Sequence, residues 1–263
     1  MSLVDHSGAM SSRWVQVEGL HNARDLGGIP LPHGTTAFGV VVRGETLVHL
    51  TATGTDDVRR LGIRHVLDLR SEHERGLEGE GLLAADYQRS LLVHEGVTLD
   101  DGVAAAGLPS GPEAAACRAE RFARYLDRGS HLLADALART AWSTSTTYLN
   151  GAAGSERTGV VAALLLELAG ARPDDIVDDY LLSADRLPRV LLRLAERPAY
   201  WDLAGLDRDV LQPSPDAMRL FLDGLVAHGG ARGWLARQGV DRETVDLLAD
   251  RLRGQPLVVR DAG

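Results

Sequence analysis

A run of small residues between a strand-like and a helix-like segment is the part of this sequence best suited to bind an anion. Residues 150–159 are Asn-Gly-Ala-Ala-Gly-Ser-Glu-Arg-Thr-Gly, and an apolar stretch begins at Val160. A loop of small residues at a helix start directs several backbone N–H groups at one point, where the helix dipole also favours negative charge. Arg157 can donate two parallel hydrogen bonds to a tetrahedral oxyanion, and Thr158 can bond back into the loop. The same run also suits a tight strand-to-helix turn that binds nothing.

Together with other segments, this loop resembles a known enzyme family. Residues 150–159 are similar to the signature of cysteine-dependent phosphatases, namely histidine, cysteine, five residues, arginine, serine or threonine, and glycine. They resemble more narrowly the atypical bacterial tyrosine/serine phosphatases, whose loop usually has the sequence His-Cys-x-Ala-Gly-Lys-Asp-Arg-Thr-Gly. Residues 22–28 (Asn-Ala-Arg-Asp-Leu-Gly-Gly) resemble that family's opening motif, and the two segments 61–75 and 178–183 resemble later motifs. Because the matches occur in the family's order over nearly the whole chain, the chain is identified as a member.

The loop departs from the family pattern at the residues that carry the chemistry. Gly151 stands at the cysteine position and Asn150 at the histidine position, while Ser155 and Glu156 stand at the lysine and aspartate positions. In the family, a cysteine thiolate attacks phosphorus and forms a covalent intermediate. Glycine has no side chain, so the resemblance implies a member that lacks this mechanism. The single cysteine of the chain, Cys117, lies in another predicted helix, where we expect a structural or incidental role.

The charged residues retained from the family motifs are the candidate site residues. Glu156 could act in general acid–base chemistry, or it could form a salt bridge or a helix-dipole contact in the first turn. Asp68 and Arg70 could face the pocket, or they could form an ion pair that ties a strand end to the 24–25 loop. The hypothesis assigns catalysis to Glu156, Asp68 and Arg157. It assigns anion binding to the loop and nearby polar residues: Asn150, Gly151, Ala152, Ala153, Gly154, Ser155, Arg157, Thr158, Arg24, Asp25 and Arg70.

Three functions are compatible with a retained charged pocket and a lost nucleophile. The favoured one is an enzyme on a phosphatase scaffold that binds an anionic substrate. Its acid–base chemistry would be of the lyase, dehydratase or isomerase type, in specialised metabolism. The first alternative is a pseudophosphatase that binds a phosphorylated ligand without turnover. The second is a cysteine-independent phosphatase in which Glu156 or Asp68 activates a water molecule.

The elements that must position these residues alternate between strands and helices. Strands are expected at 40–43, 65–70 and 144–149. Helices are expected at 55–61 (capped by Thr53 or Thr55), 112–137, 158–168 and 173–182, with two or three more in 214–252 broken at Gly229-Gly230. This order predicts an α/β fold like that of cysteine phosphatases, with a central, mostly parallel sheet flanked by helices and extra C-terminal helices. We expect a disordered or tag-like start at 1–12 and a single domain over 13–263. Within it, 76–111 would be a loop or lid insertion and 173–256 the helical C-terminal part.

Composition limits the classes of partner and ligand that we expect this chain to bind. The chain has 263 residues and a net charge of −9, which disfavours nucleic acid as a partner and leaves a small phosphate- or carboxylate-bearing ligand. All 28 basic residues are arginines, so no lysine is available for catalysis. One cysteine and no apolar run long enough to cross a membrane indicate a cytoplasmic protein. The nine histidines show no metal-ligand spacing, so neither a metal nor another cofactor is expected, and no oligomeric state is indicated.

Overall fold

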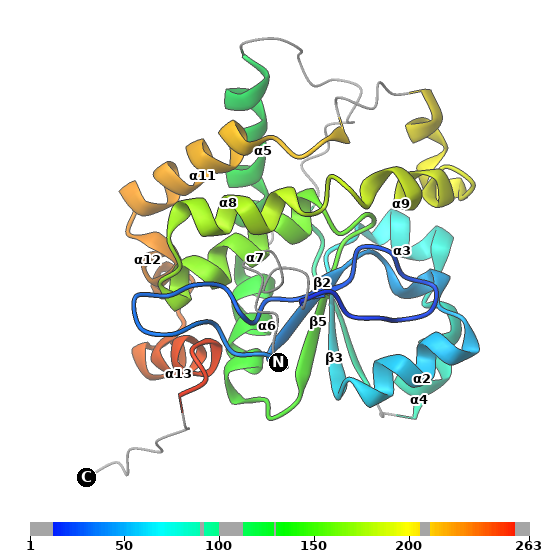
Figure 1. The fold of residues 1–263 in the computed structure, drawn as a ribbon, viewed down its shortest axis with the longest axis horizontal. Coiled ribbons are helices and arrows are strands. Elements are labelled where there is room, and N and C mark those ends of the chain that lie inside the picture. The colour runs from blue at the N-terminus through cyan, green and yellow to red at the C-terminus, as the bar shows by residue number, and fades with distance from the viewer. Residues whose placement is uncertain (1–12, 90–91, 100–112, 129, 206–210, 256–263) are drawn as a thin grey trace, which may run out of the picture.

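The computed structural model describes residues 13–89, 92–99, 113–128, 130–205 and 211–255. A five-stranded sheet forms its centre, with the strand order β1-β2-β5-β3-β4 (Figure 1). Its strands are β1 (Arg24–Asp25), β2 (Val41–Gly44), β3 (Ile63–Asp68), β4 (Val93–Gly96) and β5 (Thr146–Asn150). Only β1 runs antiparallel to its neighbour. The predicted α/β fold with a mostly parallel sheet is therefore confirmed. The predictions for 1–12, for 100–111 and for the end of the chain after 255 lie outside the described residues.

Helices cover both faces of the sheet (Figure 1). On one face lie α5 (Ala114–Arg128), α6 (Ser130–Trp142), α7 (Glu156–Ala169), α8 (Pro173–Leu181), α11 (Pro215–Ala227), α12 (Gly230–Arg237) and α13 (Arg242–Leu252). The other face carries η1 (Leu47–His49), α2 (Ala52–Arg60), η2 (Gly81–Leu83) and α4 (Ala84–Gln88). The remaining elements are α3 (Glu72–Glu78), which directly follows β3, and α9 (Leu187–Leu194) and η4 (Pro198–Gly205), which pack against each other.

The period-two alternation of the strands divides the core between the two faces. In β5, Leu149 packs into the large cluster with α5, α7 and the C-terminal helices, whereas Tyr148 packs into the smaller cluster with Val58 of α2. Helix α7 is buried almost throughout because it lies between the sheet and other helices, which explains why the sequence of this helix is apolar on every side. A third small cluster joins Ala152 to Val190 of α9 and thereby connects the loop after β5 to that helix.

Several elements differ from the sequence-based predictions. The single helix predicted at 112–137 is divided into α5 and α6, and α2 is capped by Thr51, not by Thr53 or Thr55. The described part of the predicted 76–111 loop contains η2, α4 and the edge strand β4. Strand β4 was missed because an edge strand that is half exposed needs no apolar alternation, and its sequence is Val-His-Glu-Gly.

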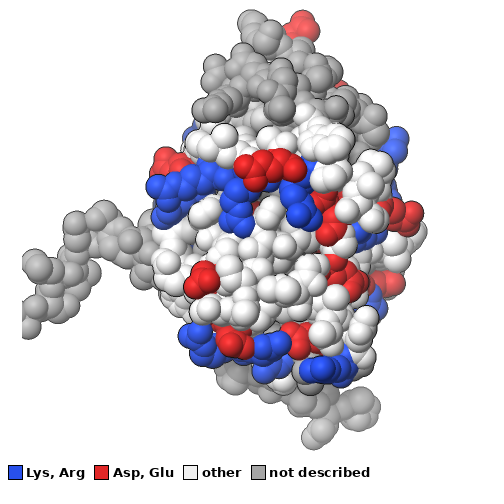
Figure 2. All heavy atoms as spheres, turned by 90° about the vertical axis from the view of Figure 1, so that its right-hand side faces the viewer, with Lys and Arg blue, Asp and Glu red and all other residues white. Residues whose placement is uncertain are grey.

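The face of the molecule shown in Figure 2 carries charged side chains of both signs. On the face shown in Figure 2, arginine and acidic side chains interleave in bands. A nucleic-acid binding surface would instead show a continuous basic patch or stripe. This view therefore gives no support to a nucleic-acid partner.

Candidate functional site

The candidate site is built on the connection between β5 and α7. Strand β5 ends at Asn150 and α7 begins at Glu156, so residues 151–155 form the loop between them. Because β5 lies between β2 and β3, this loop emerges at the middle of the sheet's carboxyl edge. Ligands bind at this edge in open α/β sheets.

Neighbouring side chains hold the loop by donating hydrogen bonds to its carbonyl groups. The Asn22 side chain donates to the carbonyl oxygens of Ala153 (3.0 Å) and Gly154 (3.4 Å), and the Arg43 guanidinium also donates to that of Gly154 (2.9 Å). Gly154 has φ +71°, and a Cβ there would overlap the backbone of Gly44, so this position requires glycine. The conformation of the loop is therefore fixed by its surroundings.

The amide groups of the segment, by contrast, have no partner. In the described part of the chain, the backbone N–H groups of residues 151–158 donate no hydrogen bond, and the first paired amide after them is that of Gly159, to Ser155 (2.6 Å). Buried backbone amides are nearly always paired, by protein, water or ligand. A row of unpaired amides at a helix N-terminus has the chemistry of an anion site.

Two hydroxyl groups of the segment are also without partners in the described part of the chain. Oγ1 of Thr158 and Oγ of Ser155 are buried and unpaired within the described residues. A Cβ placed on Gly151 would lie 3.2 Å from Oγ1 of Thr158 and 3.8 Å from Nε of Arg157. Gly151 does not have the positive φ that would favour glycine. A side chain at position 151 would therefore point toward this hydroxyl and this guanidinium.

Arg157 is oriented by a buried carboxylate. Its two Nη atoms donate to the two oxygens of Glu74, at 2.5 and 2.7 Å, and Nη1 also donates to the carbonyl of Leu69 at 3.3 Å. Glu74 at the same time forms a capping box with Ser71 at the start of α3. Burial alone would raise the pKa of Glu74, but the charge and hydrogen bonds of Arg157 outweigh burial and hold this pKa at about 2. The pKa of Arg157 is raised in turn, because the attraction of Glu74 exceeds the cost of burial.

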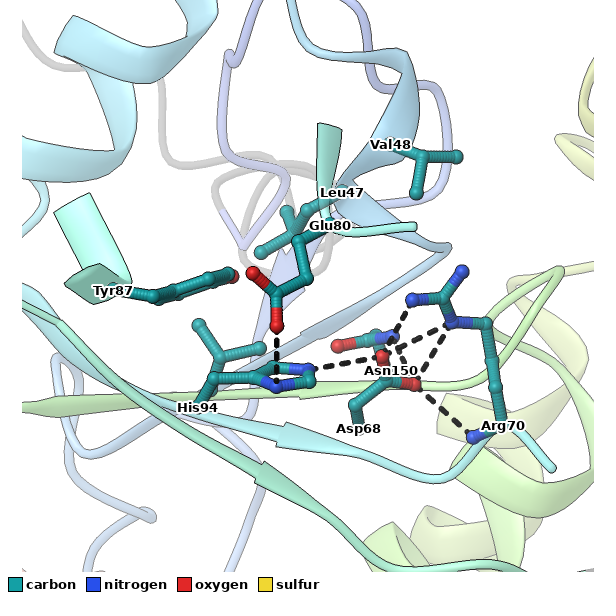
Figure 3. Close-up of a pocket in the computed structure, with 9 residues that line it drawn as sticks. Leu47, Val48, Asp68, Arg70, Glu80, Tyr87, His94 and Asn150 are labelled. Carbon is teal, nitrogen blue, oxygen red and sulfur yellow. Dashed lines mark hydrogen bonds and ion pairs between the residues drawn. The ribbon is translucent and has the colours of Figure 1, made fainter. Parts of the chain in front are cut away.

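A second polar cluster lies on the α4 face of the sheet (Figure 3). Asp68, at the end of β3, accepts hydrogen bonds from Arg70 (2.7 Å to Nη2), from Asn150 (3.0 Å) and, at 3.2 Å, from the ring of His94. Burial would raise the pKa of Asp68, but His94 and Arg70 lower it below the usual range. The other ring nitrogen of His94 lies 3.6 Å from Glu80. Asp68 is therefore a permanently ionised carboxylate at neutral pH.

Arg24 and Asp25 lie behind the loop. The Arg24 guanidinium is fully buried and donates to Asp179 (3.1 Å from Nε) and to the Asn22 side chain (2.9 Å). Asp179 also pairs with Arg13 and Arg43. The Asp25 carboxylate accepts the amides of residues 27 and 39. The structure therefore does not bring these two residues to the unpaired amides. Arg24 acts through Asn22, which holds the loop carbonyls.

Glu156 points toward α5. Its carboxylate lies 3.4 Å from the Tyr125 hydroxyl, 3.8 Å from Nε of Arg118 and 3.9 Å from Nη1 of Arg121. These contacts are longer than the ion pairs of Glu74 and Asp68, and 23% of the Glu156 side chain is exposed. The structure thus separates Glu156 from the cluster around Asp68.

Sequence reasoning did not assign roles to three residues that shape the site. Glu74, His94 and Asp179 are held by buried or half-buried ion pairs with residues far away in the sequence. The only available signal for Glu74 and Asp179 was their place in segments that resemble family motifs. His94 lies in the strand that was missed.

The described residues contain no group of three His, Cys, Asp or Glu side chains arranged to hold a metal ion. None of the helices in the described ranges is long and apolar enough to cross a membrane.

A loop of small residues joins the central strand β5 to α7 on a mostly parallel sheet. The model of the tyrosine phosphatase family matches residues 15–254, and the chain belongs to that family. The resemblance drawn from the sequence motifs is therefore confirmed.

Two relatives to which the chain is similar are named as phosphatases. The chain is 30% identical to the triple specificity protein phosphatase PtpB of Mycobacterium tuberculosis over 191 residues, which are 60% of this chain and 66% of that protein, just under two thirds. It is 29% identical to a tyrosine-protein phosphatase of Nostoc commune over 226 residues, 80% of this chain and 73% of that protein.

Proposed function

We propose that this member of the tyrosine phosphatase family binds a phosphate-bearing ligand at residues 151–158 and does not transfer the phosphoryl group to a cysteine. The observation that carries the proposal is the row of unpaired backbone amides at the start of α7. Backbone amides and a helix N-terminus bind a phosphate dianion without any contribution from a thiolate. The unpaired hydroxyls of Thr158 and Ser155 add further donors.

The N–H group at Nε of Arg157 supports the same proposal. Glu74 occupies both Nη atoms, whereas Nε donates to no described residue and faces Gly151. The ion pair therefore holds the guanidinium in one orientation and leaves an N–H on the loop side. An arginine fixed in this way loses little conformational entropy when an anion binds.

The carboxylates near the loop favour binding over turnover. Asp68 and Glu74 are held ionised by arginines, so neither can donate a proton at neutral pH, and a carboxylate with so low a pKa is a weak base. In the family resemblance, Gly151 stands at the position of the nucleophile, and it has no side chain. Of the functions considered, binding without covalent transfer is the one that needs neither a nucleophile at position 151 nor a proton donor.

The test is isothermal titration of the native protein with inorganic phosphate, combined with an assay of aryl phosphate hydrolysis. Phosphate is expected to bind, binding is expected to weaken at least tenfold in Arg157→Ala, and no hydrolysis above that of the Arg157→Ala protein is expected. Hydrolysis that Arg157→Ala abolishes would instead establish a cysteine-free phosphatase. Absence of phosphate binding would refute the proposal altogether.

Acid–base chemistry on the bound ligand is the second candidate, and Glu156 is the residue that favours it. Of the three carboxylates considered, Glu156 alone has contacts no shorter than 3.4 Å, so its charge is the least committed to a partner. A test compound is dihydroxyacetone phosphate in D2O, whose carbon-bound protons are followed by NMR. Exchange that is present in the native protein and lost in Glu156→Gln supports this function, whereas equal exchange in both proteins, or none, argues against it. Glu120→Gln, on an exposed turn of α5, is the matched control.

A further inference from the structure

A small pocket lies at the carboxyl ends of β3 and β5, on the face of the sheet that carries α4 (Figure 3). It is partly open to solvent. Asp68 and Asn150, the last residues of β3 and β5, form its floor, and Val48 lies at its upper edge in the view of Figure 3. Asn150 directly precedes the first loop residue, so one residue of the pocket lining is joined to the 151–158 segment by a peptide bond.

Two buried polar atoms of the pocket lining have no partner among the described residues. They are Nη1 of Arg70, which can only donate a hydrogen bond, and Oδ1 of Asn150, which can only accept one. Arg70 and Asn150 are 2% and 1% exposed. The orientation of the Asn150 amide follows from its bond to Asp68, because a carboxylate can accept only from the nitrogen.

The other polar groups of the pocket are already engaged. The His94 ring lies between Asp68 and Glu80, and it stacks on the Tyr87 ring with 4.9 Å between centroids. The positive charge of Arg70 is neutralised by Asp68, and Glu80 contributes a further negative charge. A second anionic group would therefore meet the oxygens of Asn150 and Glu80, whereas a neutral group that both donates and accepts would satisfy both open atoms.

We propose that this pocket binds a neutral hydroxyl group of the same ligand whose phosphate is held by residues 151–158. The hydroxyl oxygen accepts from Nη1 of Arg70, and the hydroxyl proton is donated to Oδ1 of Asn150. The substrate class is then a phosphate ester with a hydroxyl group on a neighbouring carbon atom. This inference rests on the proposed function, because the phosphate supplies the anchor.

The experiment compares four ligands by isothermal titration of the native protein: inorganic phosphate, propyl phosphate, glycerol 3-phosphate and 3-phosphoglycerate. Glycerol 3-phosphate is expected to bind about tenfold more tightly than propyl phosphate, because it forms a hydrogen bond with a charged donor and another with an amide. The carboxylate of 3-phosphoglycerate is expected to give no gain over propyl phosphate.

Two variants separate the pocket from the phosphate anchor. Val48→Phe is designed to fill the pocket from its edge without removing a polar group. Asn150→Leu removes the acceptor. In each variant the measured quantity is the ratio of the two affinities, for glycerol 3-phosphate and for propyl phosphate, so any change in phosphate anchoring cancels. Both ratios are expected to fall to about one, and Val48→Phe remains decisive if Asn150→Leu does not fold.

The outcomes are distinguishable. Equal affinities for glycerol 3-phosphate and propyl phosphate in the native protein, or tightest binding of 3-phosphoglycerate, overturn the inference but leave the proposed function standing. A ratio that Val48→Phe leaves unchanged also overturns it. If no ligand binds, inorganic phosphate included, the proposed function fails and the inference fails with it.

Discussion

Replacing Glu74 with glutamine separates the two tasks of this residue. The amide oxygen of Glu74→Gln can still accept the Ser71 backbone amide, at 2.6 Å in the native protein, so the cap of α3 can persist. The charge that pairs with Arg157 is lost. Arg157 is then left as a largely buried cation with no counter-charge at these distances among the described residues.

The size of the effect follows from the pKa of Glu74. Its fall from the ordinary value of 4.5 to about 2 corresponds to roughly 3 kcal/mol of stabilisation of the ionised form. Breaking a buried pair by removing one partner costs about 3–5 kcal/mol. With 11% of the Glu74 side chain exposed, we expect the free energy of unfolding to fall by about 2–3 kcal/mol at pH 7.

Urea denaturation at several pH values is the assay. Because the pKa is depressed in the folded state, the contribution of Glu74 is fully present above its unfolded pKa and is lost as the pH falls from about 4.5 toward 2. The difference between the native protein and Glu74→Gln is therefore expected to be constant from pH 7 to pH 5 and to shrink below pH 4.5.

Glu72→Gln is the matched control, since Glu72 lies on the exposed side of the same helical turn. Its substitution is expected to change stability by less than about 0.5 kcal/mol. If both variants lose equally little stability, the assignment of Glu74 as the residue that holds Arg157 is wrong.

Three further substitutions test the supports of the loop. Gly154→Ala places a Cβ against the backbone of Gly44 at a positive φ, so we expect a loss of more than about 1 kcal/mol in urea denaturation and weaker phosphate binding. In Gly151→Cys, the atom nearest to the added Cβ is the Thr158 hydroxyl oxygen, at 3.2 Å. We therefore expect a folded protein that gains aryl phosphate hydrolysis. A variant that folds but is inactive would count against the family's loop geometry here. Asp179→Asn leaves three buried arginines without their shared carboxylate and should lower the free energy of unfolding by about 3–5 kcal/mol, whereas an unchanged melting temperature would contradict this role.

Local pattern was sufficient for much of the fold. The β-branched residues before Gly44, the apolar run after Thr158 and the break at Gly229 and Gly230 predicted β2, α7 and the α11–α12 boundary within a few residues. These signals are local because each element follows from the period and the end signals of its own residues. The loop was also predictable, since small residues, one arginine and a helix start lie together in the chain.

The partners of the charged residues could not be predicted in the same way. The sequence led us to place Arg24, Asp25, Asp68 and Arg70 around one anion, whereas the structure pairs Asp68 with Arg70 and places Arg24 and Asp25 elsewhere. Arg24 pairs with Asp179, 155 residues later, and Asp68 with a histidine in an edge strand. Such pairs depend on which strand ends lie together and on which face each side chain points.

The sequence by itself determined the family, the absence of a side chain at position 151, the presence of Arg157 and the identity of the small residues around it. Tertiary structure alone decided that Glu74 holds Arg157, that the loop carbonyls bond to Asn22 and Arg43, and that no described residue pairs with the amides. The physical reason is that unfavourable charge burial is offset only by exact spatial pairing, and the pairing partners are brought together by the sheet, not by their separation along the chain.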